Sequence, residues 1–196
     1  MRLPKVVEEA VDNLSRLPGI GERTAQRLVF WLIGRPDDQV KRLAQSLISL
    51  TEVVVCSECG NLSDTDPCAV CTDPERDREI ICVVEESSDM LSIERAGVFT
   101  GLYHILGGSI NAMEDIHPED LNIESLVERI RQGNIEEVIL ATDPDNEGNV
   151  TANYISELLR ETDVRITRLA QGISYGSGVS YANERSIKEA FRNRRE

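Results

Sequence analysis

Along the first fifty residues, apolar positions recur every three or four residues, a spacing typical of amphipathic helices. The pattern predicts helices over residues 4–17, 22–33 and 36–50, each with its apolar face directed inward. Residues 17–21, Leu-Pro-Gly-Ile-Gly, separate the first two, and their proline and glycines predict a tight turn. The start of the chain is therefore expected to be helical, with one sharp turn.

From about residue 80, short apolar runs alternate with helical patterns. The runs predict strands at residues 80–85, within 98–106, and at 137–142 and 164–169. The intervening patterns predict helices at residues 87–96, 121–132 and 151–161. Asn122 is a candidate N-cap for the second of these helices. Strands that alternate with helices form a parallel sheet covered on both faces. The fold class is therefore predicted to be α/β with an open parallel sheet.

These patterns divide the chain into four expected parts. They are a helical module with a hairpin turn (1–53), a small four-cysteine module (54–77), the α/β domain (78–170) and a tail (171–196). In the tail, Gly172, Gly176 and Gly178 predict a flexible hairpin, followed by a short basic helix. Tyr175 and Tyr181 flank the glycines and have the chemistry to stack on a base, but we expect them to pack.

Four of the five cysteines form two C-x2-C pairs within sixteen residues: Cys56 with Cys59, and Cys68 with Cys71. The turn-forming residues around them allow each pair to direct two thiolates at one point, and four thiolates suit tetrahedral Zn²⁺. Because protein atoms would fill all four positions, one structural zinc per chain is expected. The alternatives are two disulfides or cysteines that are close only by chance, and both are disfavoured because the spacing is specific and nothing in the sequence indicates secretion. Cys82 lies in an apolar run and is expected in the core.

The net charge of −14 argues against a simple basic nucleic-acid-binding protein. Residues 1–55 contain eight Lys and Arg against seven Asp and Glu, whereas residues 56–196 contain thirteen against twenty-eight. If DNA is bound, the N-terminal module should contact it, with a modest, salt-sensitive affinity that oligomerisation would increase. The first residues lack the apolar core expected of a signal peptide, and the chain has no apolar run of about 18 residues. With the clustered thiols, this leads us to expect a cytoplasmic location and no membrane contact.

The turn at residues 17–21 has the chemistry of a phosphate-binding site. Gly19 and Gly21 leave main-chain amides accessible, and the next helix begins there with the positive end of its dipole. Arg23 and Arg27 lie on one face of that helix. The arrangement resembles the helix-hairpin-helix motif of many DNA-repair proteins and predicts DNA binding without sequence preference. The alternative is an ordinary helical corner with solvated arginines, and Glu22 beside the turn would repel a phosphate.

Two predicted strands end in carboxylates, which an open parallel sheet would bring to one crevice. Glu85 is the last residue of the first strand, and Asp143, Asp145 and Glu147 follow the third, in the string A-T-D-P-D-N-E-G. Carboxylates are hard ligands that suit Mg²⁺, so Glu85, Asp143 and Asp145 are candidate Mg²⁺ ligands.

The glutamate followed by D-x-D-x-E resembles the Toprim domain, which type IA topoisomerases, bacterial primases, some nucleases and RecR proteins share. Nearly the whole chain resembles the RecR family. The hairpin, the four cysteines, the strand I-C-V-V-E, and the strings G-L-Y-H-I-L-G-G at 101–108, H-P-E-D-L at 117–121 and L-A-Q-G-I-S-Y at 169–175 stand in the RecR order. One departure is that RecR proteins usually have a neutral A-T-N-P-T-x-E-G string where this chain has Asp143 and Asp145.

The resemblance implies a non-catalytic recombination mediator in DNA repair. RecR proteins assemble into dimers and ring-like tetramers that can surround DNA, act with RecO and RecF, and help to load RecA. By resemblance, Arg23 and Arg27 are the DNA-contacting positions. The resemblance also implies that the acidic crevice, with Glu85, Asp143, Asp145 and Glu147, serves partner contacts. The departure leaves two interpretations of the crevice: a site that binds RecO through its charge, which is favoured, and a retained Mg²⁺ site.

Two other functions compete with the mediator. One is a small Mg²⁺-dependent Toprim nuclease, of the type that matures 5S ribosomal RNA, which the acidic string favours. The other is a zinc-stabilised scaffold for other proteins, which an absence of DNA binding would favour. A topoisomerase is not expected, because the sequence shows none of the large domains that hold a nucleophilic tyrosine and pass a strand. A primase is not expected, because the sequence shows no further catalytic or helicase-binding domain. The hairpin, the cysteines and the full-length resemblance favour the mediator.

Overall fold

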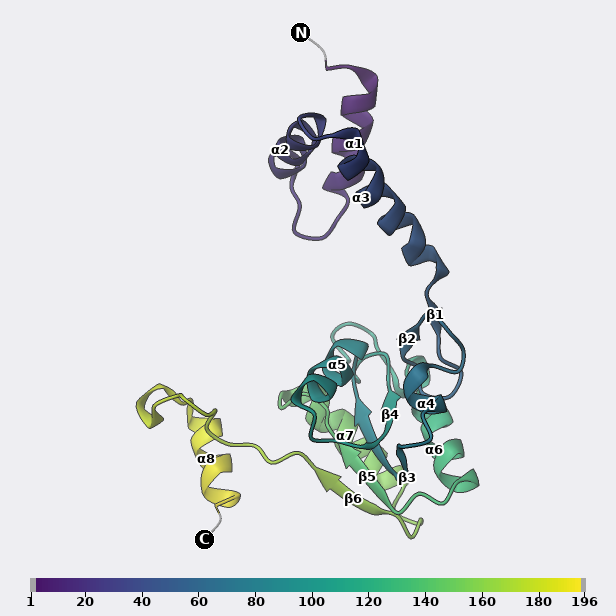
Figure 1. Cartoon of the computed structure of the whole chain (residues 1–196). Coiled ribbons are helices and arrows are strands. Elements are labelled where there is room, and N and C mark those ends of the chain that lie inside the picture. Colours follow the sequence, from purple (N-terminus) through teal and green to yellow (C-terminus); the bar gives the residue numbers. More distant parts are fainter. Residues whose placement is uncertain (1–2, 195–196) are drawn as a thin grey trace. The chain divides into compact units, whose positions relative to one another are not determined.

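The computed structural model describes residues 3–194, and its chain divides into two compact units between Val53 and Val54 (Figure 1). The first unit is helical, as predicted. Its elements are α1 (Lys5–Ser15), α2 (Glu22–Ile33), α3 (Asp37–Ser49) and a short 3-10 helix, η1 (Leu50–Glu52).

The core of the first unit lies between α1 and α2, where Val11, Ala25 and Val29 are buried. The third helix was predicted to direct its apolar face inward, but α3 has no buried residue within the described part of the chain. Leu43 and Leu47 on its apolar face are 44% and 56% exposed. Periodicity predicted that this face is apolar, but in a single chain the face is not covered.

The second unit contains the predicted parallel sheet, whose strands lie in the order β4-β3-β5-β6. The strands are β3 (Asp77–Val84), β4 (Gly101–Ile105), β5 (Glu137–Leu140) and β6 (Arg165–Arg168), and the helices around them are α5 (Ser87–Ala96), η2 (Pro118–Asp120), α6 (Ile123–Gln132) and α7 (Asn146–Leu158). Ahead of the sheet, β1 (Val54–Val55) pairs antiparallel with β2 (Leu62–Ser63), and the short α4 (Ala69–Thr72) follows.

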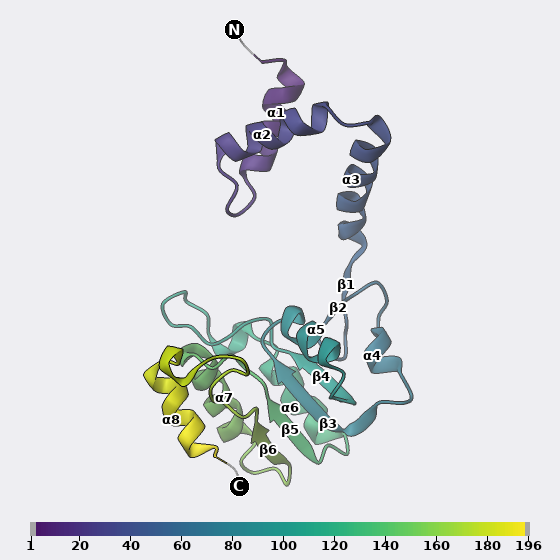
Figure 2. The same cartoon turned by 60° about the vertical axis from the view of Figure 1, so that its left-hand side comes forward.

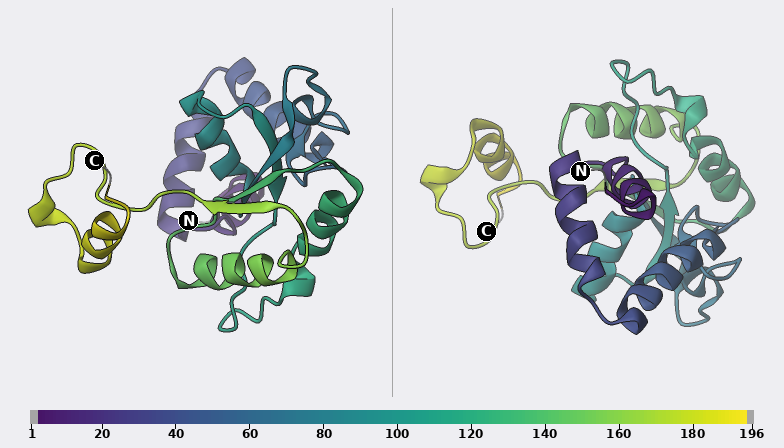
Figure 3. Two further views of the ribbon diagram at one scale, coloured as in Figure 1. Left: turned by 90° about the horizontal axis from the view of Figure 1, so that it is seen from below. Right: turned by 90° about the horizontal axis from the view of Figure 1, so that it is seen from above.

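Alternate residues of β3 enter two different cores, because successive side chains of a strand point to opposite faces. Ile81 and Val83 pack with buried residues of α6 and α7. Cys82 and Val84 pack on the other face, with Met90 of α5 and with the four-cysteine module. Seen along the sheet, α5 and the pair α6 and α7 lie on opposite sides (Figure 3, left). The prediction of a sheet covered on both faces is confirmed.

A polar network holds α5 to the sheet. The Tyr103 hydroxyl on β4 donates to Glu94 of α5 at 2.7 Å, and Arg76 donates to the same carboxylate. Arg76 lowers the pKa of Glu94, so this carboxylate is ionised. On the other face His104 is buried and its Nε2 donates to the Asn122 carbonyl at 2.7 Å, while burial lowers its pKa to about 4. His104 is therefore a neutral core histidine.

The structure corrects the prediction for α7, which begins at Asn146, five residues earlier than expected, with Asp145 as its N-cap. Asn122 precedes α6 as expected but does not cap it, because its side chain donates to the Ile105 carbonyl instead. The second cysteine pair also lies partly in a helix, since Cys71 is in α4, where only turns were expected.

The C-terminal segment ends in a helix, as predicted, but the glycine-rich part before it has no paired strands among the described residues. It contains a 3-10 turn, η3 (Val179–Tyr181), and then α8 (Glu184–Arg192). The segment leaves the edge strand β6 and folds back, so that the Asn193 side chain donates to the Gln171 carbonyl (Figure 1). Within residues 3–194, no helix is both long and apolar enough to cross a membrane.

Candidate functional site

The four-cysteine cluster has the geometry of a tetrahedral metal site. All four sulfur atoms lie within 4.8 Å of one another and are buried. The Cys56–Cys71 and Cys59–Cys68 sulfur distances are 4.0 Å and 3.6 Å, close to the roughly 3.8 Å edge of a tetrahedron with Zn–S bonds of about 2.3 Å. A disulfide would need about 2.05 Å, and all five cysteines are free thiols. The disulfide alternative is therefore wrong.

The thiols of the cluster compete for protons. A hydrogen bond from Cys71 lowers the pKa of Cys59 to about 6, whereas burial raises the pKa of Cys68. Without a cation, burial thus disfavours the charged form of Cys68, while hydrogen bonds from its neighbours favour that of Cys59. A divalent cation at the centre would neutralise several thiolates at once, which is the chemistry of a four-cysteine zinc site. Cys82 of β3 packs beside the module but is not one of the four ligating cysteines, and burial raises its pKa to about 12.

The cluster is joined to the edge of the sheet by a main-chain hydrogen bond. The Ile105 amide at the end of β4 donates to the Cys59 carbonyl at 2.7 Å. The bond gives the Ile105 amide of this edge strand an acceptor outside the sheet and links β4 directly to the cysteine module. A metal at the four cysteines would therefore also stabilise β4.

The loop between α1 and α2 projects from the end of the helix pair (Figure 2). Ile20 packs against the small core of this unit, while Gly19 and Gly21 on either side are exposed. Gly19 has φ +76°, a left-handed conformation that glycine adopts without strain. A Cβ at either glycine would meet no atom within 4 Å, so the space above the loop is open to a ligand.

The N-terminus of α2 lies at this loop. Gly21 is its N-cap, and no side chain among the described residues accepts a hydrogen bond from its first turn. The first helical amides, at Glu22 and Arg23, are thus donors without an intrahelical acceptor, at the positive end of the helix dipole. Arg23 and Arg27 are exposed, whereas Ala25 and Val29 are buried against α1. This combination can bind the phosphates of a nucleic acid.

Glu85 lies at the carboxyl end of β3, where its nearly buried carboxylate accepts a hydrogen bond from the Asp143 amide at 2.9 Å. Burial raises the pKa of Glu85, and the nearby carboxylates of Asp143 and Asp145 raise it further. Gly148 makes this contact possible, since a Cβ there would lie 2.7 Å from Glu85 Oε1. Sequence analysis missed the role of Gly148, for which its place in D-x-D-x-E-G was the available signal.

The predicted acidic set is only partly brought together. Asp145 caps α7 by accepting from the Gly148 amide at 2.8 Å, and Glu147 lies in the first turn of that helix. Within residues 3–194, the four cysteines alone form a group of three or more ligating side chains close enough to share one ion. Glu85, Asp143 and Asp145 do not form such a group, because two of their carboxylates hold main-chain amides instead.

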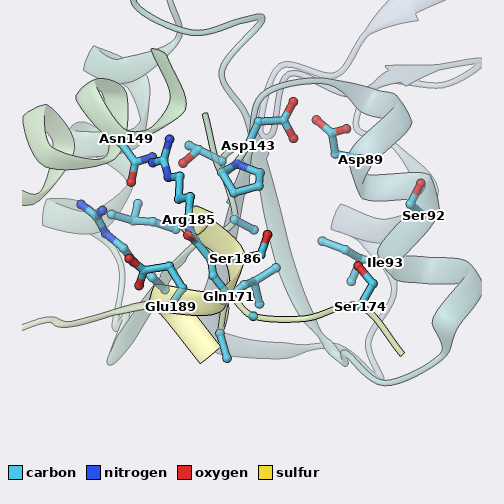
Figure 4. Close-up of a pocket in the computed structure, with 18 of the residues that line it drawn as sticks. Asp89, Ser92, Ile93, Asp143, Asn149, Gln171, Ser174, Arg185, Ser186 and Glu189 are labelled. Carbon is cyan, nitrogen blue, oxygen red and sulfur yellow. The ribbon is translucent and has the colours of Figure 1, made fainter. Parts of the chain in front are cut away.

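Asp143 lines a pocket of about 540 Å³ between the carboxyl edge of the sheet and the C-terminal segment (Figure 4). Asp89 of α5, which the sequence did not single out, lines the same pocket. Burial raises the pKa of Asp143, and Asp89 adds to the shift as a like charge. Arg185 and Asn149 lie on another side, next to each other (Figure 4). The pocket therefore has acidic and basic sides.

Comparisons with known protein families find a match for each of three parts of the chain: the hairpin, the four-cysteine module and the α/β domain. Family models match at residues 7–51 (RecR, helix-hairpin-helix), 53–73 (RecR, four-cysteine zinc finger domain) and 79–170 (Toprim domain). Together they define the class: a Toprim protein with a helix-hairpin-helix and a four-cysteine zinc finger. The four cysteines are its structural zinc site.

Relatives of known name match over nearly the full length. The chain is 46% identical to the "Recombination protein RecR" of Leifsonia xyli subsp. xyli over 192 residues, 97% of each chain. It is 42% identical to the protein of that name from Lactococcus lactis subsp. cremoris and 43% identical to that from Staphylococcus aureus, each over the whole of both chains. The chain belongs to the RecR family.

Proposed function

We propose that this chain is a non-catalytic DNA-binding mediator of recombination in DNA repair. The family and the name of its relatives support the role in recombination. In the proposal the chain binds DNA without sequence preference and forms an oligomeric clamp, a dimer or a tetrameric ring. It acts with RecO and RecF to help load RecA, and does so in the cytoplasm.

The observation that carries the DNA-binding role is the uncapped N-terminus of α2 beside an open loop. Gly19 and Gly21 present no side chain there, and the first-turn amides of α2 have no intrahelical acceptor. Arg23 and Arg27 place two cations on the exposed face of the same helix. Main-chain amides and guanidinium groups bind phosphate oxygens, which are the same at every base, so no sequence preference is expected.

The non-catalytic part of the proposal is supported by how the acidic side chains are used. Glu85 accepts from the Asp143 amide, and Asp145 accepts from the Gly148 amide. These carboxylates stabilise the loop between β5 and α7. The acidic edge formed by Glu85, Asp143, Asp145 and Glu147 is the proposed contact for RecO. A nuclease would need a shared Mg²⁺ site, whereas within residues 3–194 only the four cysteines form a group of ligating side chains close enough to share one ion.

Assembly is supported by an uncovered apolar surface on the first unit. A pocket of about 750 Å³ is lined by α1, α2 and α3 and is mostly apolar. Val6, Ile33 and Leu47 line it and are more than half exposed, which is costly for a monomer in water. A second copy that covered this surface would also place two hairpins on one DNA, which would raise the affinity of a weak single site.

The test is fluorescence anisotropy of a labelled duplex with the zinc-loaded protein at several salt concentrations. An Arg23→Ala/Arg27→Ala variant is expected to bind at least tenfold more weakly, with a log–log salt slope lower by about 1.8, since each phosphate contact contributes about 0.9. The matched control is Lys5→Ala/Arg42→Ala, which removes two exposed cations of the same unit that pair with Glu9 and Asp38. Equal binding by the hairpin variant and the control would exclude the hairpin as the contact.

A further inference from the structure

The C-terminal part of the second unit carries a charge opposite to that of the domain before it. Residues 56–164 contain six Lys and Arg against twenty-five Asp and Glu, whereas residues 165–196 contain seven against three. The acidity of the chain is therefore interrupted by a basic segment at its end. Such a segregation of charge indicates a surface for a polyanion, and the hairpin of the first unit does not account for it.

The fold gathers four of these cations in one pocket of about 690 Å³, which we call the arginine groove. Its arginines are Arg168, Arg185, Arg192 and Arg194, and Glu189 is the one carboxylate among the described residues that line it. Arg168 is the last residue of β6, whereas the other three belong to α8 or follow it. The groove thus lies at the carboxyl edge of the sheet, where ligands of open α/β sheets bind.

Two of the arginines keep their charge uncompensated. Glu189 pairs with Arg192 at 2.7 Å, but no carboxylate of residues 3–194 lies within ion-pair distance of Arg168 or Arg185. Arg168 donates to Asn153 Oδ1 at 2.9 Å, and Arg185 donates at 3.5 Å to Asn146 Oδ1 and to the Asp145 carbonyl. A guanidinium has five N–H donors, so both retain donors for a planar oxyanion such as a phosphodiester.

Exposed aromatic rings accompany this charge. Tyr175 and Tyr181 are 107% and 87% exposed, so the expectation that they pack is wrong for the single chain. Ser174, next to Tyr175, lines the pocket that adjoins the arginine groove, and Asn183, two residues after Tyr181, lines it too. Cations that follow a backbone, with exposed rings for the bases, are the features by which proteins bind single strands without sequence preference. A duplex would not offer its bases to these rings.

We propose that the C-terminal segment is a second nucleic-acid site, specific for single strands. Arg168 and Arg185 bind successive phosphates in the arginine groove, and Tyr175 and Tyr181 stack on unpaired bases. The inference rests on the proposed function only for the class of ligand, because its residues lie in a different unit from the hairpin. The two sites together would let one protein hold a duplex and a single strand, as found where a duplex ends in a single strand.

The first test measures the salt dependence of binding to a labelled oligothymidylate strand by anisotropy, with the full chain in its zinc-loaded form. Arg168→Gln/Arg185→Gln is expected to lower the log–log slope by about 1.4, since each phosphate contact on a single strand contributes about 0.7. Arg168→Lys/Arg185→Lys keeps both charges and should keep the slope. A slope unchanged in the glutamine variant would overturn the arginine groove as a phosphate site.

The second test addresses stacking. Tyr175→Ala and Tyr181→Ala are each expected to weaken binding of the strand about fivefold or more, while Tyr175→Phe and Tyr181→Phe retain the ring and the affinity. Neither tyrosine contributes to a buried core, so these variants should fold. Equal affinities for the alanine and phenylalanine variants would show that the rings do not stack on bases.

A third comparison separates this inference from the proposed function. If Arg23→Ala/Arg27→Ala loses duplex binding but keeps the single-strand slope, both proposals hold. If the groove variant binds strands like the parent while the hairpin variant binds no DNA, the groove proposal fails and the hairpin proposal stands. Binding of polyglutamate that the groove variant loses, with strand binding unchanged, would assign the groove to an acidic protein and overturn the inference.

Discussion

Glu22 places a negative charge at the first position of α2, beside the amides that are proposed to bind phosphate. An acidic residue there favours the helix but repels a phosphate at the same amides. Glu22→Gln removes the repulsion and leaves a similar side chain. The affinity of the Glu22→Gln protein for duplex DNA is expected to be about two- to fivefold higher than that of the parent at low salt, in line with the size of charge–dipole effects.

Anisotropy titrations of parent and variant measure this change. Glu8→Gln is the matched control, because Glu8 lies in the first turn of α1, at the far end of that helix from the loop. The control should leave the affinity within about twofold, as expected for a screened charge more than a Debye length away. An affinity that falls or stays the same in Glu22→Gln would mean that no phosphate approaches this helix end.

Glu85 gives the second prediction at this scale, for the dependence of stability on pH. Burial raises its pKa in the folded state, so the folded protein holds this proton more tightly than the unfolded chain. The contribution of Glu85 to stability is therefore largest below its ordinary pKa of about 4.3 and is lost as pH rises through the folded-state value. Glu85→Gln keeps an oxygen acceptor for the Asp143 amide and cannot ionise.

The stability of Glu85→Gln relative to the parent should thus increase from pH 4 to pH 7. Urea unfolding of the two proteins side by side measures the difference, in which any loss of zinc at low pH is common to both. A glutamine variant that becomes less stable than the parent as the pH rises would show that the Glu85 carboxylate is stabilised by its surroundings, as a bound cation would do.

Among the elements, the four-cysteine module depends most on its metal, since β1, β2 and α4 have two to four residues each. Cys59→Ser is expected to release the zinc and lower the melting temperature. Because the Ile105 amide donates to the Cys59 carbonyl, hydrogen exchange at Ile105 should also become faster.

Zinc content by mass spectrometry, thermal melts and amide exchange provide the three readouts. Cys82→Ala is the control, since Cys82 lies in β3 outside the cluster and should retain one zinc per chain. Full zinc content and unchanged melting in Cys59→Ser would rule out the structural role of the metal. Unchanged exchange at Ile105 in a Cys59→Ser variant that has lost its zinc would show that β4 does not depend on the module.

The elements also show what the sequence can predict. Long periodic stretches such as α2 and the apolar strand β3 were predicted closely, because burial imposes the period. The first turn of α7 was missed, because residues 146–149 are Asn-Glu-Gly-Asn, and they become helical through the Asp145 cap and the contact of Gly148 with Glu85.

Of the candidate sites, the cysteine spacing predicted the metal site, since each C-x2-C pair sets the positions of its two thiols locally. The arginine groove was not predictable from the sequence. Arg168 and Arg185 are separated by an irregular loop, and such a loop has no periodic pattern that would place them on one surface.

For the whole molecule, the apolar surface of the first unit predicts self-association. Periodicity identified the apolar face of α3 but not what covers it, and within one chain nothing in the described residues does. Leu43→Glu/Leu47→Glu changes two exposed residues, so the fold should persist by circular dichroism while sedimentation velocity shows a shift towards monomer.

Val98→Glu is the control for this variant, because Val98 is 81% exposed in the second unit, outside that surface. Loss of assembly should also weaken binding to a long duplex more than to a short one, since several hairpins share the long one. A Leu43/Leu47 variant that sediments like the parent would assign this surface to some other contact.

The central claim is that main-chain amides at the start of α2 hold the phosphates of a nucleic acid. The direct measurement is amide chemical-shift mapping by NMR of the ¹⁵N-labelled protein as a short duplex is added. The account predicts that the largest shifts occur at Gly19, Gly21, Glu22 and Arg23. Binding that shifts other amides and leaves these four in place would contradict it.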